Sequence, residues 1–212
     1  MARTIIGGVI AGIILFVVGF IFWATPLGAI AFSKASDVKN AAVQTALAQN
    51  LTETGTGTYT IPAHNSAPGA VLYAKGPIAT VHFNTRGFSP DDTSMLIPGA
   101  IIALVCGLLI AFGLAAVSAG TSFAGMARLV VLFSLAFTIW EFLASPVFNH
   151  YGWGHWIYAF IAETVSLILA GLVVARWFVP GMPVRHATPA PAPAPAPAEA
   201  PASPPASTSA EG

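Results

Sequence analysis

The sequence predicts a membrane protein of the all-α class, in which four transmembrane helices form a bundle. Composition is the first observation: 56% of the 212 residues are hydrophobic and only 8% are charged, whereas soluble domains carry roughly 25% charged residues. The second is a set of four apolar segments, each close to the roughly 20 residues that a helix needs to cross a bilayer. The third is a polar stretch of about 60 residues between the first two segments, too long for a structureless loop. We therefore expect a small α+β extracytoplasmic cap there.

The four apolar segments divide the chain into parts. Residues 1–33 should contain the first transmembrane helix, residues 34–94 the cap, residues 95–179 the other three helices, and residues 180–212 a tail. Because non-helical backbone cannot face lipid, each span must be helical. The expected spans are residues 4–24, 95–118, 127–144 and 157–179.

The start of the chain also resembles a signal peptide. Met1-Ala2-Arg3 precedes the long apolar stretch, and Ala29-Ile30-Ala31 offers small residues for cleavage. Signal peptides usually have an apolar stretch of only about 7–15 residues, which is shorter than the stretch present here. An uncleaved membrane anchor is therefore the favoured interpretation.

Basic residues in the short loops indicate how the helices are oriented. Four arginines flank the same end of the expected helices: Arg3, Arg128, Arg176 and Arg185. The turn at residues 145–155, at the other end, contains neither Lys nor Arg. Short loops rich in Lys and Arg stay in the cytoplasm. Both termini are therefore expected in the cytoplasm, with the cap on the outer face.

The pattern within the cap predicts one helix and three short strands. Residues 36–50, rich in Ala, Gln and Leu, form the expected helix. The strands are expected at residues 56–61, 70–74 and 78–84. Residues 89–92, Ser-Pro-Asp-Asp, have the composition of a helix start, so we expect the second transmembrane helix to begin there. Because so short a segment buries little core, it should pack on the helices.

The tail, residues 180–212, has a composition of its own. Beyond His186 proline alternates with alanine. Alternating prolines remove backbone donors and favour an extended polyproline conformation. We therefore expect a disordered, Pro/Ala-rich cytoplasmic tail.

The second expected transmembrane helix carries a row of small residues at every fourth position, which we call the ridge. The ridge consists of Gly99, Ala103, Gly107, Ala111 and Ala115. Small residues let two helix backbones approach closely, which matters because lipid provides no hydrophobic drive between helices. The ridge either packs inside the bundle or forms a surface for self-association, and internal packing is the favoured interpretation.

Two glutamates, Glu141 and Glu163, are the ionisable residues that lie well inside the expected spans. A charge at mid-bilayer costs at least ~2.5–3.5 kcal/mol, so both should face the bundle interior. Their helices form an antiparallel hairpin, which would bring them to similar depth. The candidate site around them comprises Glu141, Glu163, His150, His155, Thr138 and Ser166.

Three interpretations of this candidate site are open. The glutamates can be structural, protonated and hydrogen-bonded to neighbouring hydroxyls. With His150 or His155 they can bind a divalent metal such as zinc, iron or manganese. They can also relay protons or bind a small cation. The spacing is not diagnostic; the structural interpretation is favoured, and no cofactor is predicted.

Composition and motifs exclude several other functions. Eight basic residues balance eight acidic residues, which leaves no basic surface for nucleic acid. The single cysteine, Cys106, excludes an internal disulfide and zinc sites built from cysteine pairs. The sequence contains no G-x-S-x-G, Walker A or dinucleotide-binding motif.

Two short motifs precede the second span: residues 57–62, GTYTIP, and residues 73–77, YAKGP. With four spans around them, they resemble a family of uncharacterised bacterial four-helix membrane proteins over residues 1–180. That resemblance implies the fold and a bacterial inner membrane, and it implies no activity. The layout is similar to that of claudin-like proteins in architecture alone, because their tryptophan and paired-cysteine signature is absent.

These observations predict an integral protein of the lipid bilayer that serves as a non-enzymatic accessory, assembly or scaffolding subunit. It would act through its cap and its ridge on another membrane protein or on a second copy of itself. The alternative is a membrane metalloenzyme, or a proton- or cation-handling protein, that uses Glu141 and Glu163.

Overall fold

Four long helices dominate residues 1–179, the part of the chain that a computed structural model describes. Each is long and apolar enough to cross a membrane. They match the four expected spans: Ala2–Trp23 (α1), Leu96–Val117 (α4), Phe123–Asn149 (which joins α5, η2 and α6) and Trp153–Phe178 (which joins α7 and η3). The expected tail, residues 180–212 with Arg185, lies outside the described residues.

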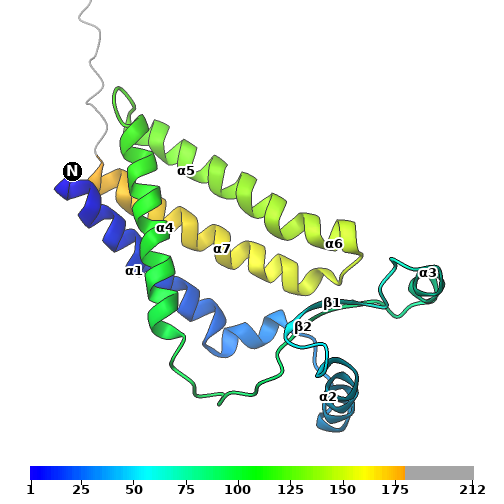
Figure 1. Ribbon diagram of the computed structural model, residues 1–212. Helices are drawn as coiled ribbons and strands as arrows, with labels where there is room; N and C mark the ends of the chain where they lie inside the picture. The colour runs from blue at the N-terminus through cyan, green and yellow to red at the C-terminus, as the bar shows by residue number, and fades with distance from the viewer. Residues whose placement is uncertain (180–212) are drawn as a thin grey trace, which may run out of the picture. The chain divides into compact units, whose positions relative to one another are not determined.

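The helices pack as two pairs. α1 lies across α4, and α5, Phe123–Thr138, runs beside α7, Trp153–Val173 (Figure 1). α1 also packs on α7, which joins the two pairs. The core consists mainly of small and branched side chains: Ala11, Ala111, Leu114, Met126, Val130, Ala170, Val174, Ala175 and Val179. Small side chains bring the backbones close together, and the dispersion contacts of that close packing stabilise the bundle.

The ridge of α4 faces α1. A Cβ atom at Gly107 would overlap the backbone of Gly8 and Gly12. A Cβ atom at Gly12 would in turn lie 2.7 Å from the Cα atom of Leu104. All five ridge residues are buried or half-buried: Gly99, Ala103, Gly107, Ala111 and Ala115. The ridge therefore serves a close contact between two helices of the same chain.

Basic side chains gather where α1 and α5 begin and where η3, Val174–Phe178, ends. Arg3 donates from Nε to the backbone oxygen of Trp177 across 3.0 Å. The guanidinium carbon of Arg176 lies 5.7 Å from the centroid of the Phe123 ring, which is a cation–π distance. These contacts hold the beginning of α1 and the end of the fourth span at the same end of the bundle.

The cap follows a 3₁₀ turn, Pro26–Ala31 (η1), that ends the first span. Its elements are Asp37–Leu51 (α2), Gly57–Ile61 (β1), Ala67–Lys75 (α3) and Ala79–Phe83 (β2). The two strands pair antiparallel with Tyr59 opposite Val81, and the rings of Tyr59 and Phe83 meet edge to face at 6.4 Å. The expected cap helix and the first and third expected strands are confirmed.

The expected strand at residues 70–74 is wrong, because these residues lie in α3. The Ser66 hydroxyl oxygen accepts a hydrogen bond from the backbone N–H of Gly69 at 3.2 Å and caps the helix start. Gly76, with φ of +62°, ends the helix. These start and stop signals outweigh the strand preference of the β-branched and aromatic residues between them.

The expected helix start at residues 89–92 is also wrong, because α4 begins at Leu96. The backbone N–H of Asp92 instead donates to the oxygen of Ser89 and closes a turn. The Asp92 carboxylate accepts hydrogen bonds from the backbone N–H and from the hydroxyl of Ser94, at 2.8 and 3.0 Å. These hydrogen bonds hold the pKa of Asp92 below its usual value, and the bond from the backbone N–H has the larger effect. Ser and Asp side chains can cap the start of a helix, but between residues 89 and 94 they hydrogen-bond within local turns instead.

Candidate functional site

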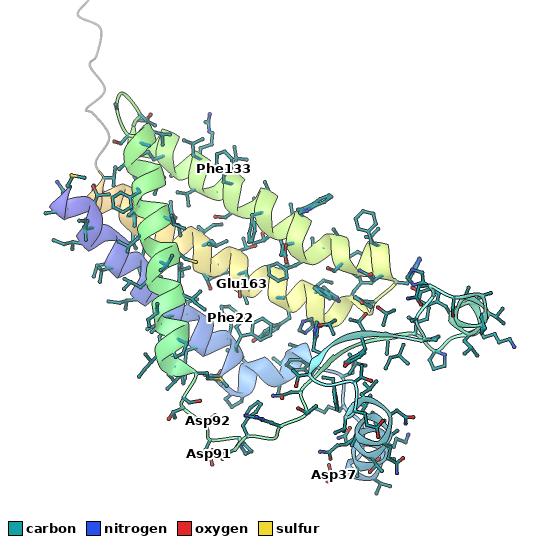
Figure 2. The ribbon with its side chains drawn as sticks, viewed as in Figure 1. Phe22, Asp37, Asp91, Asp92, Phe133 and Glu163 are labelled. Atoms are coloured by element: carbon teal, nitrogen blue, oxygen red, sulfur yellow. The ribbon has the colours of Figure 1, made fainter. Side chains whose placement is uncertain are left out.

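Glu163 on α7 accepts a hydrogen bond from Trp23 at the end of α1. Nε1 of Trp23 and Oε1 of Glu163 lie 3.3 Å apart, and both side chains are half-buried. Figure 2 shows Glu163 on the side of α7 that faces α1 and Phe22. A carboxylate among apolar helices is costly unless a donor satisfies it. Trp23 supplies that donor from a different helix.

Aromatic side chains surround this hydrogen bond. The Tyr158 hydroxyl donates to the backbone oxygen of Phe22, and its ring meets the rings of Phe22 and Trp23 edge to face at 6.0 and 5.3 Å. The ring of His155 lies 6.0 Å from that of Trp23. We call this group the Trp23 cluster: Phe22, Trp23, Phe32, His155, Trp156 and Tyr158. Its ring contacts fix the end of α1 against the first turns of α7.

The two histidines of the candidate site are not bound to its carboxylates. Among the hydrogen bonds of residues 1–179, none links His150 or His155 to Glu141 or Glu163. His155 contacts rings, and His150 is exposed with φ of +55° where α6, Ala144–Asn149, ends. In this described part of the chain, no three His, Cys, Asp or Glu side chains are grouped so that they could hold a metal ion.

Two threonines join α5 to α7. The Oγ1 atoms of Thr138 and Thr164 lie 2.7 Å apart. Thr138 is fully buried and donates to the backbone oxygen of Ser134 at 2.8 Å, so its oxygen is free to accept from Thr164. Ser166, also buried, donates to the oxygen of Ala162 within its own helix. These hydroxyls are satisfied by structural contacts between and within helices.

Glu141 is exposed, so the expectation that both glutamates face the bundle interior is wrong for this residue. Simple α-helical periodicity continues the buried side of α5 from Thr138 to Glu141 and Ser145. In the structure the residues from Ile139 to Leu143 form a π-helical turn, η2. A π-helical turn contains an additional residue and shifts the buried side accordingly. The buried positions become Met126, Val130, Ser134, Thr138 and then Pro146.

Pro146 explains why the helix widens there. Proline has no N–H to donate, and in a regular α-helix its ring would clash with the carbonyl oxygen four residues earlier, at Phe142. A wider turn just before the proline relieves that clash. The third span therefore runs through to Asn149, past its expected end at Ala144, and turns Glu141 outward as it does so.

An open depression of about 710 Å³ lies beside the contact between the cap and the bundle. The hydroxyls of Thr80 in β2 and Tyr151 before α7 are hydrogen-bonded there. The residues that line it include Phe32, His82 and Trp156, and none of them is Lys, Arg, Asp or Glu. The depression therefore offers ring faces and neutral hydrogen-bonding groups.

Three residues of the observed site were not expected from the sequence: Trp23, Tyr158 and Thr164. Trp23 is the last residue of a helix that is apolar from Ile5 onward, where a tryptophan usually indicates only the membrane interface. The signal in the sequence for its role in the site was its position at the end of the span that precedes the cap. Thr164 follows Glu163 directly, but its pairing with Thr138 requires the register of the α5–α7 hairpin.

Comparisons of the chain with protein-family models, with curated proteins and with solved structures give no match. The fold and the site therefore define its class: a protein with four helices of membrane-spanning length and a small α+β insertion between the first two. In this protein a carboxylate that is hydrogen-bonded to a tryptophan lies between the first and fourth spans.

Proposed function

We propose that this protein is a non-enzymatic accessory or assembly subunit of a membrane complex and that it binds its partner through the cap. The observation that carries the proposal is the exposure of the cap: not one residue from 34 to 94 is buried. A segment of this size that buries no core gains little hydrophobic stabilisation. Contact with a second protein would supply the surface that the cap lacks.

Exposed apolar side chains on the cap support this proposal. Val38 on α2 is 80% exposed, and Val71 and Leu72 on α3 are each 55% exposed. Neighbouring exposed apolar side chains on a protein surface are typical of interaction sites. α3 carries its two on adjacent residues, which makes it the part of the cap that we expect to contact the partner.

The proposed location is the inner membrane of a bacterium, with both termini in the cytoplasm and the cap outside. The support comes from Arg3 and Arg176, which lie at one end of the bundle, and from the positive-inside rule. The resemblance to bacterial four-helix membrane proteins points to the same compartment. The ridge of α4 packs on α1 of the same chain, so the proposal assigns partner binding to the cap.

The alternative function, metal chemistry or proton and cation handling by Glu141 and Glu163, has less support. It needs the two carboxylates to share a site, whereas Glu141 is exposed and Glu163 is hydrogen-bonded to Trp23. We therefore assign Glu163 a structural role within the proposed accessory subunit.

Purification from native membranes in a mild detergent tests the proposal. We expect native mass spectrometry to show a stoichiometric complex, and the double variant Val71→Ser/Leu72→Ser to lose its partner at least about tenfold, because it removes apolar contact surface. The matched control is Val105→Ala/Leu109→Ala, which truncates two exposed side chains of α4 and should retain the partner. A monomeric wild-type protein, or a complex that survives the α3 substitutions, would contradict the proposal.

A further inference from the structure

The carboxylate of Glu141 has no partner among residues 1–179: the hydrogen bonds in this part of the chain include none to its side-chain oxygens. Its backbone oxygen accepts from Ser145 at 3.4 Å, but the carboxylate itself is exposed on the outer side of the third span. Glu163, by contrast, is satisfied by Trp23. The two glutamates therefore differ in whether the carboxylate has a hydrogen-bond donor within the described part of the chain.

Large aromatic side chains share the exposed side of the helix with Glu141, and we call this the Glu141 face. It comprises Phe133, Phe137, Trp140 and Phe148, which are 71%, 57%, 71% and 71% exposed. The rings of Trp140 and Phe148 meet at 6.4 Å, and Figure 2 shows Phe133 on the side of α5 away from α7. Aromatic residues are enriched where proteins contact one another. The face thus combines ring surface with one unsatisfied carboxylate.

From the length of the helix we infer that this carboxylate lies below the membrane surface. The segment Phe123–Asn149 has 27 residues, which at 1.5 Å per residue gives about 40 Å, against a hydrocarbon core of about 30 Å. If the segment is centred in that core, Glu141, eight residues before Asn149, lies about 7 Å inside the boundary. A glutamate side chain is shorter than the lysine and arginine side chains that reach the interface from such depths.

We propose that the Glu141 face binds one transmembrane helix of a different protein and that this helix carries a lysine or arginine at the depth of Glu141. Ionisable residues inside spans normally pair with one another, and opposite charges attract far more strongly in a medium of low dielectric constant than in water. A basic residue on the neighbouring helix supplies the donor that this chain does not. The inference rests on the proposed accessory function and names the chemistry of the partner.

A second copy of this chain does not supply that basic residue. The sequence has no Lys or Arg from residue 4 to 33, from 87 to 127 or from 129 to 175. Copies inserted in the same direction would therefore place Glu141 against apolar side chains or against another glutamate. Like charges at the same depth repel each other, so charge complementarity favours a different protein.

A synthetic single-span peptide of leucine and alanine, with one lysine about 7 Å from its outer hydrophobic boundary, serves as the probe. The control peptide has leucine in place of the lysine. The full-length protein, labelled with a donor dye at its N-terminus, and the acceptor-labelled peptide are reconstituted in phosphatidylcholine vesicles, which carry no net lipid charge. Energy transfer measures the apparent Kd. We expect the lysine peptide to bind at least about tenfold more tightly than the leucine peptide.

Three variants assign the preference to one carboxylate. Glu141→Gln should abolish the preference for lysine, Glu141→Asp should retain part of it, and Glu163→Gln, the matched control, should leave it unchanged. Circular dichroism and a thermal melt verify that each variant is folded. Equal binding of the two peptides to the wild-type protein, or a preference that persists in Glu141→Gln, would overturn the inference.

The result is separable from that of the proposed function. If the lysine preference fails while the native complex still depends on Val71 and Leu72, the cap alone binds the partner and the Glu141 face is a lipid-facing surface. If the lysine preference holds while the native protein is monomeric, the docking inference survives and the accessory function fails.

Discussion

The indole N–H of Trp23 donates to the carboxylate of Glu163 across 3.3 Å and connects the first span to the fourth. We predict that Trp23→Phe destabilises the protein by roughly 1–3 kcal/mol, because it leaves a half-buried carboxylate without its donor. Glu163→Gln should cost less, since an amide oxygen still accepts from the indole. Steric-trapping or denaturant unfolding in detergent micelles measures both changes.

A double-mutant cycle separates the hydrogen bond from the loss of ring contacts. Trp23→Phe should cost less in a Glu163→Leu background, where no carboxylate remains to be satisfied, and the two substitutions should be non-additive by at least about 0.5 kcal/mol. Additive effects would mean that the pair contributes packing alone.

Glycine at position 107 is required by the contact between α4 and α1, whereas glycine at position 113 is not. A Cβ atom at Gly107 would overlap the backbone of Gly8 and Gly12, and one at Gly113 would meet nothing within 4 Å. We predict that Gly107→Ala destabilises the protein by about 1–3 kcal/mol through overpacking. Gly113→Ala, the matched control, should be neutral or slightly stabilising, because alanine favours helix. Thermal melts that rank the two variants in the opposite order would contradict this packing.

The positions of the four long helices follow from the sequence because a hydrophobic segment of spanning length has one stable conformation in lipid, a helix. The ridge was recognisable for a similar reason: small residues at every fourth position lie on one side of an α-helix. Which helix the ridge contacts could not be deduced, because α1 and α7 both carry small residues at that spacing. The glycine contacts of α1 decide it.

The candidate site was less predictable because it depends on helix register. Thr138 and Ser166 were expected on inward faces and are buried. Glu141 was expected beside them, but one additional residue in the π-helical turn Ile139–Leu143 rotates it outward. Pro146, two residues beyond the expected end of the third span, is the signal in the sequence for that turn. Trp23 could not be assigned to Glu163 because no local pattern relates residues at such sequence separation.

The hydroxyl pair of Thr138 and Thr164 offers a further test of the hairpin register. We predict that Thr138→Val and Thr164→Val each destabilise the protein by about 0.5–1.5 kcal/mol, because each breaks the contact between α5 and α7. The double variant should cost less than the sum, since both substitutions remove the same bond. Unfolding measurements on the three variants provide the cycle. Ser166→Ala removes only a bond within its own helix and serves as the control, with no coupling to Thr138 expected.

The turn before α4 gives a prediction for pH dependence. The backbone N–H and then the hydroxyl of Ser94 lower the pKa of Asp92 from its ordinary value of 3.8. A carboxyl whose pKa is lower in the folded protein stabilises the fold above its unfolded pKa, and that contribution is lost as the pH falls through the folded pKa. We therefore expect the turn to loosen only below about pH 4. Carbon-13 NMR titration of the Asp92 carboxyl should show that Ser94→Ala raises its pKa part of the way back, because the backbone donor remains. Ser89→Ala, which removes no bond to the Asp92 carboxylate, should leave that titration unchanged, and an equal shift in both variants would contradict the assignment to Ser94.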